Sequence, residues 1–135
     1  MLVSALVVVL AACSGPNMKG VTTPTPETII GKPPTPSSGD AAAGRQLFIK
    51  NGCGACHIFT PAGTTGTIGP NLDNLAAAAK VANQGTLEQF TNSSIINPTA
   101  YIAPGYPSGV MPVTYAQHLG AKGVADIVAF LVKGR

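Results

Sequence analysis

The chain has 135 residues, of which 45% are hydrophobic and 10% are charged, and its formal net charge is +3. This length allows one small domain with flanking segments, because globular domains commonly contain about 100–150 residues. The charge is weak and no basic cluster follows a helix face, which argues against a nucleic-acid-binding protein. The chain lacks Trp and has four Phe and three Tyr. A core this small usually needs a disulfide, a metal or a large ligand to be stable.

An apolar run near the N-terminus ends at a cysteine. Residues 2–12 are apolar except for Ser4, and a helix of this length is about 16 Å long, too short for a hydrocarbon core of about 30 Å. The length is typical of the hydrophobic region of a signal peptide. The run ends in LAAC, which resembles the cleavage and lipidation box of bacterial lipoproteins. We therefore expect a lipoprotein-type signal peptide at 1–12 and a lipid on Cys13. An ordinary signal peptide and a trimmed transmembrane helix are the alternatives.

The next segment is rich in Pro, Thr, Ser and Gly, and it contains the sequences TPTP and KPPTPSSG. Proline removes backbone donors and fixes φ, so this composition favours extended, solvated conformations. Fully extended, the segment would span about 80 Å. We expect residues 13–39 to be the lipidated cysteine followed by a tether that joins a membrane anchor to the domain. The alternatives are a tail without a role and a strap on a partner subunit. Such an anchor would hold the domain on the extracytoplasmic face of a bacterial membrane.

The remaining residues, 40–135, form the predicted domain. Asp40 and Thr86 are suitable helix N-caps, and apolar residues at helical spacing follow in the chain. Loops rich in Gly and Pro separate the predicted helices, and no convincing alternating strand pattern appears. The sequence therefore predicts an all-α domain of about four helices. The expected helical stretches are 40–52, 71–83, 86–96 and 121–133.

The motif CGACH occupies residues 53–57. Cys53 and Cys56 have the spacing at which two thiols add to the vinyl groups of a haem, and His57 would then be an axial iron ligand. A structural zinc site needs four ligands, and only His118 remains as a candidate fourth. A thioredoxin-like redox pair normally lies in a βαβ context, which is not predicted here. One covalently bound haem c explains the odd number of cysteines, with two used for haem and one for lipid. It also supplies the large apolar body that the small domain needs.

Met111 is the candidate for the second axial ligand. It lies in the predicted domain, in a loop bounded by prolines rather than on an apolar helix stripe. A thioether is a soft ligand, so His/Met ligation raises the reduction potential and leaves no open iron position. His118 is the competing ligand and would give a lower potential. An open or water-bound position is the third alternative.

Further motifs precede and follow the CGACH motif: GRQLF at 44–48, GPNL at 69–72, SIINP at 94–98, PGYP at 104–107, VMP at 110–112 and DIVAFL at 126–131. With them, the domain resembles class I c-type cytochromes, especially those fused to or serving bacterial haem–copper oxidases. The resemblance implies the small cytochrome c fold, with the helices packed around one covalently bound haem. It also implies that the carbonyl of Pro70 accepts a hydrogen bond from Nδ1–H of His57.

The same resemblance places Gly44 and Phe48 where the first helix crosses the last one, near Ile127 and Phe130. A glycine at such a crossing permits close approach because it has no Cβ. The chain departs from the family at 120–123, where GAKG replaces the usual Ser-Pro-Glu-Glu type of helix start. This replacement weakens capping and helix propensity there.

The functional expectation is a single-electron carrier in a membrane-associated respiratory or photosynthetic chain, with no small-molecule substrate and no enzymatic activity of its own. The partner would be a membrane redox complex, either a terminal oxidase or a quinol-oxidising complex such as alternative complex III, in which the chain could be a fixed subunit. A haem enzyme or gas sensor with an open sixth position is the main alternative. A non-redox, metal-stabilised interaction module is another. The domain carries six basic and four acidic residues, so long-range steering should be weak once two propionates are added.

Overall fold

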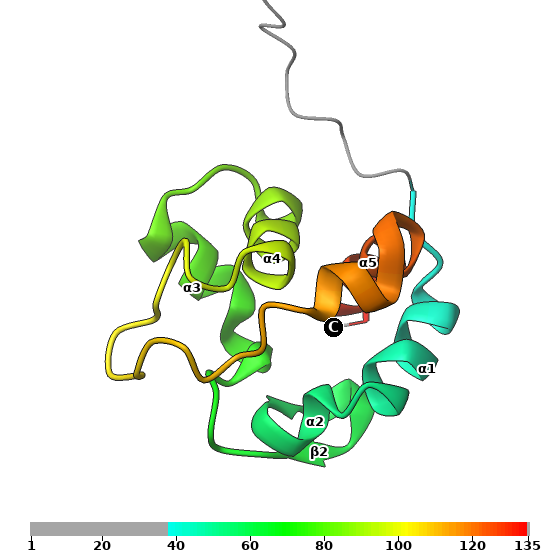
Figure 1. The fold of residues 1–135 in the computed structure, drawn as a ribbon, viewed down its shortest axis with the longest axis horizontal. Coiled ribbons are helices and arrows are strands. Elements are labelled where there is room, and N and C mark those ends of the chain that lie inside the picture. The colour runs from blue at the N-terminus through cyan, green and yellow to red at the C-terminus, as the bar shows by residue number, and fades with distance from the viewer. Residues whose placement is uncertain (1–37, 135) are drawn as a thin grey trace, which may run out of the picture. The chain divides into compact units, whose positions relative to one another are not determined.

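A computed structural model describes residues 38–134 of the chain (Figure 1). The expected signal peptide and the lipid on Cys13 lie outside these residues, as does nearly all of the expected tether. The described part is mainly helical, so the all-α prediction is confirmed. None of its helices combines the length and hydropathy needed to cross a bilayer. In chain order the elements are α1 (Ala41–Lys50), α2 (Cys53–Cys56), β1 (Ile58–Phe59), η1 (Thr60–Ala62), β2 (Thr64–Thr65), η2 (Leu72–Asn74), α3 (Leu75–Ala82), α4 (Leu87–Ile96) and α5 (Tyr115–Lys133).

Some elements differ from the sequence expectation. The short strands β1 and β2 pair antiparallel, with Ile58 opposite Thr65, although no strand pattern was expected. The expected helix at 71–83 begins as the 3₁₀ turn η2 before it becomes α3. The helix expected at 121–133 is present, and α5 also includes helical turns before it, from Tyr115; the two parts are separated at Gly120, whose φ of 64° and ψ of 172° are non-helical. This backbone conformation is accessible essentially only to glycine. The structure therefore needs a glycine at position 120, directly before the second part of α5.

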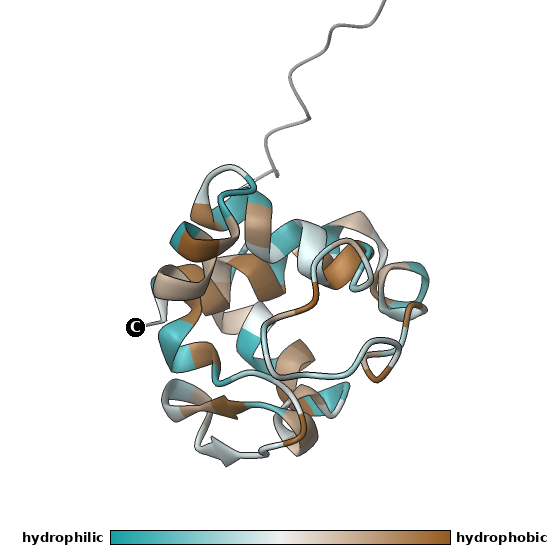
Figure 2. Ribbon diagram, turned by 90° about the vertical axis from the view of Figure 1, so that its left-hand side faces the viewer, coloured by the Kyte–Doolittle hydropathy of each residue, from teal (hydrophilic) through white to brown (hydrophobic). Residues whose placement is uncertain are grey.

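The main packing contact of the fold joins α1 to α5, which lie side by side in Figure 1. Gly44 faces the backbone of Asp126 so closely that a Cβ there would overlap the Asp126 carbonyl, and it would lie 2.9 Å from Cβ of Phe130. The rings of Phe48, Phe59 and Phe130 pack beside this crossing, with centroid separations of 5.2–5.9 Å. Hydrophilic and hydrophobic residues alternate along the helices in Figure 2, as expected for amphipathic helices around one core.

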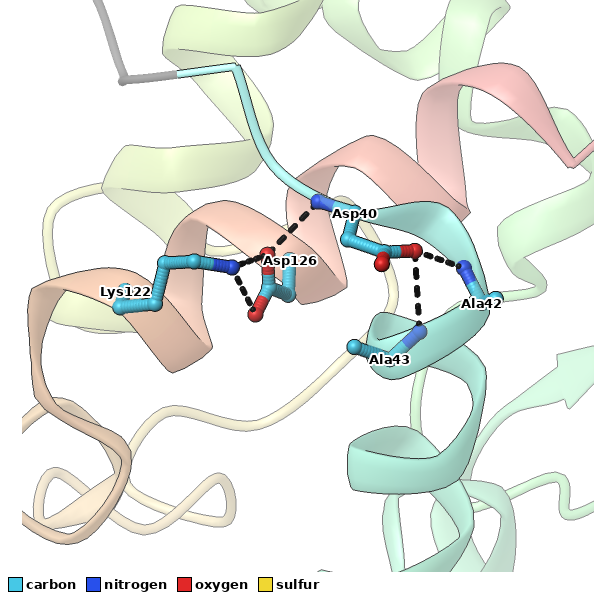
Figure 3. Close-up of polar contacts among 5 residues, drawn as sticks. All are labelled: Asp40, Ala42, Ala43, Lys122 and Asp126. Atoms are coloured by element: carbon cyan, nitrogen blue, oxygen red, sulfur yellow. Dashed lines mark hydrogen bonds and ion pairs between the residues drawn. The ribbon is translucent and has the colours of Figure 1, made fainter.

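A buried carboxylate fixes the beginning of α1 to the middle of α5 (Figure 3). Asp126 is 4% exposed. Its Oδ1 accepts a hydrogen bond of 2.7 Å from the backbone N–H of Asp40, and Lys122 Nζ lies 2.6 and 2.7 Å from its two oxygens. The carboxylate of Asp40 in turn caps α1 by accepting from the N–H groups of Ala42 and Ala43. The Lys122 hydrogen bond, followed by that of the Asp40 N–H, holds the pKa of Asp126 below its usual value.

The Gly44 contact predicts that Gly44→Ala will destabilise the protein. A methyl group at this position must push α1 away from the backbone of α5, and overpacking of this kind costs about 1–3 kcal/mol. Guanidinium unfolding of the holoprotein measures the loss. Gln46→Ala, on the exposed face of the same helix, is the matched control and should change the free energy of unfolding little. Equal effects of the two substitutions would contradict the close crossing.

The Asp126 contacts predict a specific acid sensitivity. Because the pKa of Asp126 is lower in the folded state, its charged contacts stabilise the protein above about pH 4, the usual range for a free Asp, and are lost as the pH falls through the folded-state pKa. The free energy of unfolding of the wild type should therefore fall more steeply below about pH 4 than that of Asp126→Asn. Lys122→Met should lose part of this dependence. Parallel curves for all three proteins would show that the carboxylate contributes no linkage.

Candidate functional site

An apolar cavity opens between α2, the segment 68–72, α4 and the loop 98–112. Its walls include the aromatic rings of Phe48, Phe90 and Tyr101. The charged side chains of the described residues do not contribute to the lining. The candidate residues from the sequence meet here, since both cysteines of the motif, His57, Pro70 and Met111 line this cavity.

The two cysteines occupy the ends of a single helical turn. Gly52 begins α2 in a left-handed conformation, with φ of 69°. Cys53 and Cys56 are three residues apart on this turn, a spacing that brings two side chains to the same helix face. Burial raises the pKa of the Cys53 thiol, whereas the attacking thiol of a thioredoxin-like pair has a lowered pKa.

His57 is held in one orientation by the loop at residues 69–70. Its Nδ1 lies 2.7 Å from the carbonyl oxygen of Pro70, and a carbonyl can only accept, so Nδ1 carries the proton and donates it. The other ring nitrogen, Nε2, then has a free lone pair for a ligand or metal. Gly69 lies against the ring, where a Cβ would be 2.5 Å from Cε1 of His57, and its N–H donates to the Cys56 carbonyl at 2.7 Å. The loop therefore fixes both the tautomer and the position of the imidazole.

The segment after His57 is closed by residues that the sequence did not indicate. The hydroxyl of Thr64 donates to the His57 carbonyl at 2.9 Å and accepts from the Phe59 N–H at 3.0 Å. The carboxylate of Asp73 accepts from the backbone N–H and the hydroxyl of Thr60, at 2.8 and 2.7 Å. The Thr64 bonds close the segment 57–64 on itself, and the Asp73 bonds tie this segment to the residues that follow Pro70. Nothing in the sequence marks them, because isolated Thr and Asp residues in loops are common.

Met111 and His118 lie in different surroundings. Met111 is partly buried and lines the cavity from the long loop between α4 and α5. His118 is exposed on the first turns of α5 and does not line the cavity. The cavity therefore brings Met111, and not His118, together with the CGACH residues. A tetrahedral zinc site that uses His118 is not supported by this arrangement.

These residues fit a covalently bound haem. The cavity offers two thiols on one helical turn, an imidazole with a free Nε2, a thioether, and walls made mainly of apolar side chains. Thioether attachment uses the thiols, and the nitrogen and sulfur donors suit the two axial positions of haem iron. The apolar walls suit the faces of a porphyrin.

Comparison with known proteins points to a haem-binding family. The family model described as cytochrome c matches residues 41–135, which is more than half of the chain and includes every helix of the described part. The comparison with curated proteins found no similar sequence. From its helical fold, its cavity and this match, the chain belongs to the cytochrome c family, whose members carry covalently bound haem c and transfer electrons.

Proposed function

We propose that the chain carries one haem and serves as a single-electron carrier in a membrane-associated electron-transfer chain. The observation that carries this proposal is the convergence of Cys53, Cys56, His57 and Met111 on one apolar cavity. The two thiols would hold the haem as thioethers, and His57 Nε2 and the Met111 sulfur would be the axial ligands. When bound, the haem supplies an iron that gains and loses one electron without a substrate bond being made or broken.

The protein contributes to this function by tuning and protecting the site. Donation from His57 Nδ1–H to Pro70 keeps the ring in one tautomer and raises the basicity of Nε2. The thioether of Met111 is a soft donor that favours the reduced metal and so raises the reduction potential. The apolar walls, including Phe90 and Leu131, exclude water and lower the local dielectric. Retention of both axial ligands would leave no position for a small-molecule substrate.

The place of the carrier in the cell is part of the proposal. An apolar N-terminal run that ends at Cys13 supports export and lipid anchoring on the extracytoplasmic side of a bacterial membrane. The Pro-rich residues 14–39 would then tether the domain, and a tether raises the effective concentration of a domain near its membrane partner. The partner would be a terminal oxidase or a quinol-oxidising complex. Mass spectrometry of Cys13 and of proteins that co-purify from solubilised membranes tests these assignments.

The covalent attachment is tested on the purified full-length protein from a host that matures c-type cytochromes. The c-type absorption spectrum should survive denaturation and extraction with acidic acetone, because thioether bonds are not broken by either. Replacing both Cys53 and Cys56 with Ala should remove the colour from the denatured protein. A colourless wild type with free thiols at both positions would refute haem attachment.

The axial ligand is tested by Met111→Ala. Removal of the thioether should lower the reduction potential by on the order of 0.1 V and allow carbon monoxide to bind the reduced protein. His118→Ala is the matched control and should leave both properties unchanged, because this side chain is exposed away from the cavity. Rapid carbon monoxide binding by the wild type would instead favour an enzyme or gas sensor with an open sixth position.

A further inference from the structure

The loop that carries Met111 packs against the hydrophobic core at its two ends. Residues 102–114 belong to the connection between α4 and α5, and most of them are exposed. Among the described residues, Tyr101 before this stretch and Tyr115 after it pack against the core, and no buried or partly buried hydrophobic residue between them does. Met111 is close in the chain to Tyr115 and farther from Tyr101. The nearer core contact of the loop is therefore Tyr115.

Tyr115 also joins this loop to the segment that precedes the CGACH motif. Its hydroxyl donates to the backbone carbonyl of Asn51 over 3.4 Å, a long hydrogen bond between residues 64 apart in the chain. Asn51 is the C-cap of α1 and stands just before Gly52 and Cys53. Its backbone N–H and side-chain amide both donate to the Leu47 carbonyl, at 3.0 and 2.8 Å, which holds Asn51 in place. Because Tyr115 also lines the cavity, one side chain links the two segments that carry the thiols and Met111.

The turns at 115–119 depend on side-chain contacts because the helix that follows them is broken. Gly120 interrupts α5, so the part of α5 that is fixed to α1 does not continue as one regular helix to Tyr115. Leu119 makes the second contact of these turns. A Cβ on Gly123 would lie 3.2 Å from Cβ of Leu119 and 3.5 Å from Cδ1 of Leu47, so both leucines lie against Gly123. The contacts of Tyr115 and Leu119 therefore set the position of the turns relative to α1.

We propose that Tyr115 is a positioning residue that keeps Met111 at the iron by holding the end of the Met111 loop against α1. This inference rests on the proposed function, in which Met111 is an axial ligand. Within the loop, the backbone hydrogen bond from the Tyr106 N–H goes to the carbonyl of Ala103, so it does not tie the loop to the rest of the domain. Without the Tyr115 contacts the loop would be freer, and binding of Met111 to the metal would cost more conformational entropy. The fraction of molecules in which Met111 has left the iron would then rise.

The test measures how tightly added imidazole binds the iron of the oxidised full-length holoprotein in detergent. Imidazole binds only molecules whose sixth position is open, so its apparent Kd falls as that fraction rises. Tyr115→Leu, which removes the ring and the hydroxyl, should lower this Kd about tenfold. Tyr115→Phe, which removes the hydroxyl alone, should lower it about two- to fivefold. The matched control is Gln117→Ala, an exposed side chain on the same turns, and it should stay within about twofold of the wild type.

A double-mutant cycle separates positioning of Met111 from a general loosening of the protein. In Met111→Ala the sixth position is open in every molecule. Adding Tyr115→Leu to this variant should therefore leave the imidazole Kd within about twofold. All variants should keep the covalent c-type spectrum after denaturation, which shows that haem attachment is unchanged.

Three results would overturn the role of Tyr115. These are a wild-type Kd in Tyr115→Leu, an equal change of Kd in Gln117→Ala, and an equal effect of Tyr115→Leu with and without Met111. A Tyr115→Phe protein equal to the wild type would refute the contribution of the Asn51 hydrogen bond. Failure of the proposed axial ligation would look different, because Met111→Ala would then bind imidazole no more tightly than the wild type.

Discussion

The hydrogen bond between His57 Nδ1 and the carbonyl of Pro70 is the interaction on which the site depends. It joins the end of α2 to a loop thirteen residues later, and it leaves one ring nitrogen free to face a ligand. Gly69 makes this bond possible, because any side chain there would occupy the space of the imidazole. The Thr64 and Asp73 hydrogen bonds then hold the segment between these points. The geometry of the imidazole is therefore set by backbone and loop contacts and does not rely on the bound group alone.

Most of the contacts that hold the helices together lie at the crossing of α1 and α5, which overlaps the cavity only in part. At the crossing of α1 and α5, Gly44 and Phe130 bring two helices together without an intervening ligand, and Asp126 adds a buried polar tie to the beginning of α1. The cavity shares only part of this core, through residues such as Phe48 and Ile127. A small domain buries little apolar surface by itself. Helix packing at the crossing and a large apolar ligand in the cavity can together complete its core.

The distribution of charge has a consequence for how such a protein would find a partner. None of the Asp, Glu, Lys or Arg side chains in the part of the chain that the structure describes lines the cavity. The described residues carry five basic and four acidic side chains, so attraction of a partner over long distances would be weak. A membrane anchor and a flexible tether are a physical substitute for steering, because they confine the search to the membrane surface. Under the proposed function, a lipid on Cys13 and the Pro-rich segment 14–39 would serve as this anchor and tether.

The sequence by itself determined the haem motif, the helical class and the approximate extent of four helices, because capping residues, apolar periodicity and the CxxCH spacing are local signals. It also indicated Met111 as the second ligand and, through the family resemblance, the carbonyl of Pro70. Only the tertiary structure decided contacts such as Asp40 with Asp126, which are 86 residues apart, and the closure of the site by Thr64. The turn of helix before Gly120 also emerged only from the fold. Each depends on which surfaces meet, and no local pattern records that.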